Sequence, residues 1–171
     1  NDPQVREFNE NYSLGMKHFK ENEILKAIPY LSRCLEVKVD LKGKEDELIC
    51  GVYFSLGSIY RELNYFPKAI EHYKQALDIA LNKIKIGYTL TACIYFYLGN
   101  TYIDQKLFQE GIDCFKRCLK IRKDYSIHDD TEGLIYYSLG LAYLKSRNYK
   151  KSIKYLNYAF SSAMKILGQY N

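Results

Sequence analysis

The 171-residue chain has an average composition for a globular protein, with 47% hydrophobic and 26% charged residues, which excludes a disordered acidic tail or a collagen-like fibre. No run approaches 18 consecutive apolar residues, so the sequence predicts no membrane span. The formal net charge of +5 arises at the C-terminal end, because residues 141–171 hold six basic and no acidic residues.

Cysteine usage favours a reducing compartment. The five cysteines are odd in number, scattered, and include no CxxC pair, unlike the dense pattern of a secreted disulfide scaffold. No secretory signal or lipidation motif is recognisable. We therefore expect a cytoplasmic location. The sequence also begins without Met, and we expect it to be part of a longer protein.

The scarcity of proline, with three in the chain, favours long helices. Asp2 and Pro3 are suited to the cap and first position of the first helix. Pro29 falls inside the second helix, which therefore either begins late, near Lys26, or bends at the proline. Taken in chain order, the predicted helices cover residues 3–21, 24–41, 45–63, 66–84, 88–105, 108–124, 130–146 and 149–167.

An internal repeat explains this alternation. A Leu-Gly pair recurs at steps of 42, 42 and 41 residues, as Leu14-Gly15, Leu56-Gly57, Leu98-Gly99 and Leu139-Gly140. Three residues after each glycine comes a ring, as His18, Tyr60, Tyr102 and Tyr143. Further on come a small, a bulky and a second small residue: Ala27, Leu31 and Cys34; Ala69, Tyr73 and Ala76; Gly111, Phe115 and Cys118; Ser152, Leu156 and Ala159.

The spacing within each unit is helical, so each unit is predicted to be a helix-turn-helix hairpin. We expect the two helices to approach closely at positions such as Gly57 and Ala69, with the rings filling the space between neighbouring units. The first helix of each hairpin should stop near a turn-forming residue, namely Asn22, Asn64, Lys106 and Asn148. The sequence thus predicts an all-α, right-handed α-solenoid, a single domain over residues 1–171 with repeats at 3–41, 45–84, 88–124 and 130–167.

These columns resemble the tetratricopeptide repeat (TPR), and the unit that matches best reads Tyr53, Leu56-Gly57, Tyr60, Ala69, Tyr73 and Ala76. The resemblance covers nearly the whole chain. The period is longer than the usual 34 residues, and the usual proline is absent. Units of this length are similar to those of kinesin light chains, Pins-type adaptors and bacterial peptide-sensing regulators. The resemblance implies a peptide-binding groove in which an Asn occupies the position of Asn100.

In a stack of such hairpins, the first helices line the concave surface. A row of rings, Tyr12, Phe54, Phe96 and Tyr137, falls on this face, together with Ser55 and Tyr97. The alternative is that these rings pack against the next unit. The residues expected to bind a peptide are Tyr12, Met16, Phe54, Ser58, Arg61, Phe96, Asn100, Tyr137, Leu141 and Lys145.

The predicted function is a noncatalytic adaptor that binds a peptide or partner helix. The alternatives are the peptide-sensing TPR portion of a bacterial transcriptional or signalling regulator, and a docking segment of an enzyme or motor subunit. An enzyme is not expected, because no phosphate-binding glycine loop, serine elbow or HExxH motif occurs. The Lys and Asn pattern with which chaperone-binding TPR proteins hold a carboxylate is also absent.

No cofactor or metal is expected, because His18, His72 and His128 are far apart in the sequence. A metal at His128, Asp129 and Asp130 is disfavoured, since adjacent residues rarely converge on one ion. Cys114 and Cys118 are expected to be buried structural thiols.

The C-terminal part of the chain carries two further features. Its lysines are expected to form a solvated outer face or to contact an acidic protein or a membrane surface, whereas nucleic acid is disfavoured because no binding motif accompanies them. These residues are Lys116, Lys120, Lys123, Lys150, Lys151 and Lys154. The last helix has an apolar face that predicts self-association or cover by further sequence: Ile153, Leu156, Ala163, Ile166 and Leu167.

Overall fold

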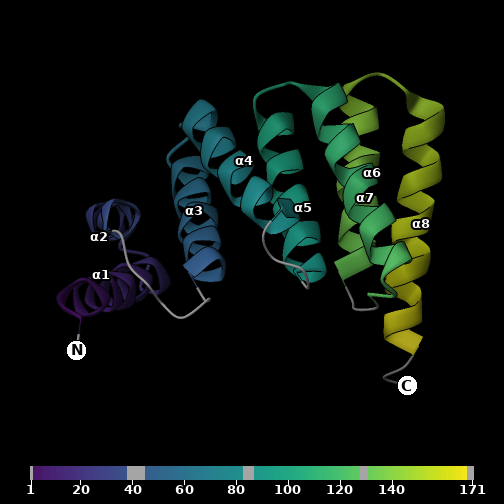
Figure 1. Cartoon of the computed structure of the whole chain (residues 1–171). Helices are drawn as coiled ribbons and strands as arrows, with labels where there is room; N and C mark the ends of the chain where they lie inside the picture. Colours follow the sequence, from purple (N-terminus) through teal and green to yellow (C-terminus); the bar gives the residue numbers. More distant parts are fainter. Residues whose placement is uncertain (1, 38–44, 83–86, 128–130, 169–171) are drawn as a thin grey trace. The chain divides into compact units, whose positions relative to one another are not determined.

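The computed structural model describes residues 2–37, 45–82, 87–127 and 131–168. These residues form eight α-helices and no strand. The chain divides into two compact units, Asn1–Gly87 and Tyr88–Asn171. Each unit contains four of these helices, and consecutive helices lie side by side in hairpins (Figure 1).

The first unit contains α1 (Pro3–Lys20), α2 (Ile24–Glu36), α3 (Glu45–Glu62) and α4 (Phe66–Asn82). The second contains α5 (Tyr88–Asp104), α6 (Phe108–Asp124), α7 (Thr131–Lys145) and α8 (Tyr149–Gly168). Consecutive helices pair as α1 with α2, α3 with α4, α5 with α6, and α7 with α8. Within each unit, the second helix of the first hairpin packs on the first helix of the next.

The start of α1 confirms the expected cap. The Asp2 side chain accepts a hydrogen bond of 2.9 Å from the backbone nitrogen of Gln4, and Pro3 is the first helical residue. The second helix begins at Ile24 and continues through Pro29, so a late start near Lys26 is wrong.

The expected end of the second helix at residue 41 is also wrong. The helix ends at Glu36 because Val37 adopts an extended backbone, with φ −79° and ψ 118°. β-Branched side chains such as that of Val37 favour extended backbone over helix. Residues 38–44, which include the predicted break at Gly43, lie outside the described part of the chain.

Within each hairpin, the turn places a non-glycine residue in the left-handed region. These residues are Asn22, Asn64, Lys106 and Arg147, with φ between 60° and 65°. The first three were expected, whereas the expectation of Asn148 for the fourth is wrong by one residue because the last repeat step is 41. The Asn148 side chain instead accepts a hydrogen bond of 3.2 Å from the backbone nitrogen of Lys151 and so caps the start of α8.

Each Leu-Gly glycine lies beneath the bulky residue of the second helix. A Cβ at Gly57 would lie 2.8 Å from the Tyr73 ring, and one at Gly99 would lie 2.9 Å from the Phe115 ring. The same contact joins Gly15 to Leu31 and Gly140 to Leu156. Glycine is therefore required because the larger residue occupies the space that a Cβ would fill.

The rings that follow the glycines in the first, second and fourth hairpins stack on a ring of the second helix of their own hairpin. Tyr60 also packs against the core of the first two hairpins, as expected of a ring between neighbouring repeats. The Tyr60 and His72 rings lie 5.2 Å apart at 13°, and the Tyr143 and Tyr155 rings 5.5 Å apart at 9°. The His18 and Tyr30 rings make the same contact at 5.5 Å and 17°. In the third hairpin, Cys114 occupies the position that holds Tyr30, His72 and Tyr155 in the other hairpins.

A substitution at Gly111 tests the close approach of α5 and α6. A Cβ there would lie 2.5 Å from Ile103 Cδ1 and 2.9 Å from the Gly99 carbonyl oxygen. We expect Gly111→Ala to lower the free energy of unfolding in urea by about 1–3 kcal/mol, because the helices must move apart. The control is Gly51→Ala, where the nearest atom, the Tyr12 hydroxyl, is 3.8 Å away. It should raise the stability by about 0.5–1 kcal/mol, and equal effects of the two changes would contradict this packing.

His72, on which the Tyr60 ring stacks, predicts that the second hairpin is sensitive to acid. Burial lowers the pKa of His72, the nearby Lys68 cation adds to this, and Glu71 opposes it. Its Nδ1 is buried without a hydrogen-bond partner among the described residues. The unfolded chain takes up this proton near pH 6.5 and the folded chain only at lower pH. The contribution of His72 to stability is therefore complete above about pH 6.5 and is lost as the pH falls through the folded pKa.

The variant His72→Tyr, which introduces the residue found at Tyr30 and Tyr155, should remove this dependence. We expect its melting temperature to fall less than that of the original chain between about pH 7.5 and 5.5. Parallel pH profiles for the two proteins would show that His72 does not contribute.

Candidate functional site

In the first unit, α1 and α3 lie against each other and bring Tyr12 and Met16 beside residues of α3. The Tyr12 ring stacks on Phe8 at 6.1 Å and 9°, and burial raises the pKa of its hydroxyl. Ser55 donates a hydrogen bond of 3.5 Å to the Met16 sulfur. Because Ser55 is only 4% exposed, the expectation that it faces the groove is wrong.

Phe54 and Ser58 are tied to the second helix of their hairpin. The Phe54 ring packs against Tyr73 at 5.7 Å and 56°. The Ser58 hydroxyl donates to the Phe54 carbonyl oxygen at 3.1 Å and hydrogen-bonds with the Tyr73 hydroxyl at 3.0 Å. Both residues remain half-buried, as does Arg61 at the end of α3. The first unit therefore offers a partly solvent-accessible face with rigidly held rings.

In the second unit, α5 carries the corresponding pair Phe96 and Asn100. The Phe96 ring packs against Phe115 at 5.9 Å and against Tyr97 at 5.5 Å, edge to face. The Asn100 amide nitrogen donates to the Phe96 carbonyl oxygen at 3.1 Å. This bond uses one amide hydrogen, so the other amide hydrogen and Oδ1 can serve a ligand.

A cavity of about 230 Å³ opens next to Phe96, between α5, α6 and α7. Apolar side chains dominate its wall, and the Arg122 side chain, on a residue only 7% exposed, contributes a cation. The cavity has room for an apolar side chain of a ligand. The lining residues are Thr89, Ala92, Cys93, Phe96, Tyr97, Cys118, Arg122, Thr131, Leu134 and Ile135.

The remaining candidates lie on α7 at helical spacing, four residues apart. Tyr137 is 49% exposed, Leu141 is half-buried and Lys145 is exposed. Tyr137 is thus the most exposed ring of the expected row, whereas Tyr12, Phe54 and Phe96 are half-buried against rings of their own hairpins.

Several lining residues were missing from the expected binding residues, above all Cys93, Arg122 and Leu134, whereas Tyr97 was expected on this face. Arg122 could have been found from the sequence. It lies seven residues after Phe115 and four after Cys118, so it continues the buried stripe of α6. A charge within an apolar helical stripe indicates a special environment.

All five cysteines are thiols, and four of them are buried, including Cys114 and Cys118 as expected. Burial raises the pKa of Cys34 and of Cys50 to about 11, so both stay protonated at neutral pH. Cys93 is half-buried and its pKa is also raised by burial.

The six lysines expected on an outer face are exposed. Lys151 lies 5.3 Å from the centre of the Tyr143 ring, and Lys154 lies 5.7 Å from that of Tyr158. The proposed cluster of His128, Asp129 and Asp130 lies outside the described residues. Over the described part of the chain, no helix has the length and apolar character needed to cross a membrane.

Comparison with family models finds the tetratricopeptide repeat twice, over residues 10–82 and 90–164. A sequence search of curated proteins gives no significant match.

Solved structures show the same fold. BtubC (BKLC) from P. vanneervenii has a TM-score of 0.83 and 18% identity, over 94% of this chain and 65% of its own. The apo form of RapI has a TM-score of 0.78 and 20% identity, over 93% of this chain and 57% of its own. The Rap conjugation gene regulator of plasmid pLS20, solved with the Phr* peptide, has a TM-score of 0.69 and 18% identity, over 90% of this chain and 42% of its own. The expected all-α fold of TPR hairpins is confirmed, and the chain spans about two thirds or less of the length of these proteins.

Proposed function

Because the chain belongs to the tetratricopeptide repeat family, we propose that it is a noncatalytic module that binds a peptide or partner helix through the first helices of its hairpins. The observation that carries this proposal is the cavity beside Phe96 in the second unit. An apolar ligand side chain would enter the cavity, while Asn100, one helical turn away, would hydrogen-bond the ligand main chain. Rings such as Tyr137 supply a large contact area for the rest of the ligand.

The first unit would contribute a second contact region on α1 and α3. Tyr12, Met16 and Phe54 offer apolar surface, and Ser58 and Arg61 offer polar groups beside it.

The proposed location is the cytoplasm, because a reducing compartment keeps buried cysteines as thiols.

The alternative proposal is the peptide-sensing TPR portion of a bacterial regulator. The Rap regulator of plasmid pLS20, which shares the fold, was solved with a bound Phr* peptide. The two proposals agree on a peptide ligand and differ in the consequence of its binding. The full reading frame separates them, since a regulator would carry a DNA-binding or response-regulator-binding domain beside this one.

Binding can be tested with peptides selected on the 171-residue chain from a phage-displayed random library. We expect Phe96→Ala and Tyr137→Ala to weaken the affinity of the selected peptide about tenfold, and Asn100→Ala about fivefold through lost hydrogen bonds. Matched controls on the exposed surface of α8 are Tyr149→Ala and Asn157→Ala. If the control and test variants weaken binding equally, or neither does, the proposed face is not the binding site.

Cys93 provides a readout that does not depend on mutation, because it lines the cavity. A bound peptide should slow the alkylation of this thiol several-fold, measured by mass spectrometry of the modified peptide. An unchanged alkylation rate at saturating peptide would mean that the cavity stays open and is not used.

We also propose that α8 mediates self-association, as its apolar residues predict. Ile153 on α8 is 61% exposed. Its counterpart one repeat earlier is Ile112 on α6, a helix on which α7 packs, and Ile112 is 2% exposed. Phe160 and Met164 extend the exposed apolar surface. Sedimentation velocity should show a dimer at high concentration, and Ile153→Lys should shift it to monomer. A clean monomer for the original chain would contradict this proposal.

A further inference from the structure

The turn between α1 and α2 holds two glutamates beside the last turn of α1. Asn22 takes the left-handed conformation, with φ 60°. The backbone nitrogen of Glu21 donates to the Lys17 carbonyl oxygen at 2.9 Å, and that of Glu23 to the His18 carbonyl oxygen at 2.8 Å. These bonds fix the backbone of both glutamates relative to His18, so their closeness follows from the turn and not from chance side-chain positions.

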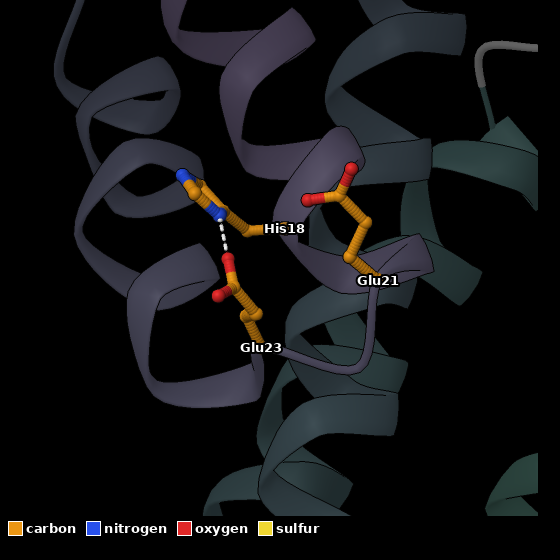
Figure 2. Close-up of side chains that lie close together, drawn as sticks. All are labelled: His18, Glu21 and Glu23. Atoms are coloured by element: carbon orange, nitrogen blue, oxygen red, sulfur yellow. Dashed lines mark hydrogen bonds and ion pairs between the residues drawn. The ribbon is translucent and has the colours of Figure 1, made fainter.

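Ligand atoms of the three side chains lie near one another. His18 Nδ1 and Glu23 Oε2 are 2.5 Å apart, and one ligand atom from each of His18, Glu21 and Glu23 lies within 4.8 Å of the other two. Figure 2 shows the His18 ring and the Glu23 carboxylate turned toward each other, with the Glu21 side chain beside them. Because the His18 ring stacks on Tyr30, the direction of its Nδ1 is held by packing.

The repeat shows that this combination is special to the first hairpin. The same turn hydrogen bonds place Tyr60, Tyr102 and Tyr143 at the position of His18. The positions of Glu21 and Glu23 hold Leu63 and Tyr65, Gln105 and Leu107, and Ser146 and Asn148. None of these nine residues is His, Cys, Asp or Glu. The first hairpin therefore has metal-ligand side chains at three positions where the others have mainly apolar or ring residues.

The donor set suits a borderline divalent ion. Zn²⁺ accepts one imidazole nitrogen and carboxylate oxygens at about 2.0–2.2 Å, which places tetrahedral ligand atoms about 3.4 Å apart. Glu21 is exposed, so its side chain can move inward to this distance. Lys26 contacts Glu23 through Oε1 at 2.6 Å, which leaves Oε2 toward His18 and supplies the outer hydrogen bond usual for a ligating carboxylate.

Solvent access is compatible with an ion that keeps bound water. The His18 side chain is 18% exposed and that of Glu23 36%. Three protein ligands leave at least one coordination position for water or for a group of a partner.

We propose that His18, Glu21 and Glu23 form a binding site for a divalent transition-metal ion of the Zn²⁺ class. The ion replaces the direct contact between His18 Nδ1 and Glu23 Oε2 and links the end of α1 to the start of α2.

The test is calorimetric titration of the 171-residue chain with Zn²⁺ under conditions that keep the thiols reduced. We expect one ion per chain, with His18→Gln and Glu21→Gln each weakening the affinity about tenfold or more. The matched control Glu62→Gln, an exposed glutamate at the end of α3, should bind as the original chain does. If His18→Gln is misfolded by circular dichroism, Glu21→Gln decides, since Glu21 is exposed.

Co²⁺ distinguishes this site from cysteine ligation. A nitrogen and oxygen site gives visible Co²⁺ bands without the thiolate charge-transfer absorption that cysteine ligands produce, and both Co²⁺ and Zn²⁺ should raise the melting temperature. The proposal is overturned if the chain binds no Zn²⁺ at about 1 mM, if the thiolate band appears, or if the two variants bind as tightly as the control. The cluster would then be an ion pair between His18 and Glu23 only.

Discussion

The structure depends on one contact repeated in each hairpin, a glycine of the first helix beneath a bulky side chain of the second. Gly57 under Tyr73 and Gly99 under Phe115 are the best examples, and a Cβ would collide with the ring in both. This contact sets how closely the helices pair, and it positions the residue that directly follows the glycine, which is Ser58 in α3 and Asn100 in α5. Because Tyr73 also bonds Ser58, the core residue and the surface residue are one packed unit.

Sequence periodicity was sufficient to predict the hairpins, since glycine, small and bulky columns each have a steric cause that recurs every 42 residues. It could not predict which neighbour a ring would contact, because Tyr60 both packs against the core shared with the first hairpin and stacks on His72 of its own hairpin. The end of α2 at Glu36 was missed because no glycine or proline marks it. Among the binding candidates, Ser55 was misplaced by a burial that helical spacing alone does not reveal.

The candidate site also has residues that the repeat pattern predicts and residues that it does not. Phe96, Asn100 and Tyr137 follow from their place on the first helices, whereas the cavity requires Arg122 from the second helix of the same hairpin. The cluster of His18, Glu21 and Glu23 requires a left-handed residue, Asn22, in the turn that brings both glutamates back beside the end of α1. The repeat pattern thus predicts the shared hairpin scaffold. The candidate metal ligands instead lie at positions where one hairpin differs from the others.

The central claim is that a peptide ligand is held by the first helices, with an anchor in the cavity beside Phe96. The most direct measurement is the change in backbone and Asn100 side-chain amide NMR signals when a selected peptide is added to the 171-residue chain. The account predicts that, within the second unit, the largest changes fall on α5 and α7 and include the Asn100 amide. Changes confined to the exposed surface of α8, or an unperturbed Asn100 amide at saturation, would contradict it.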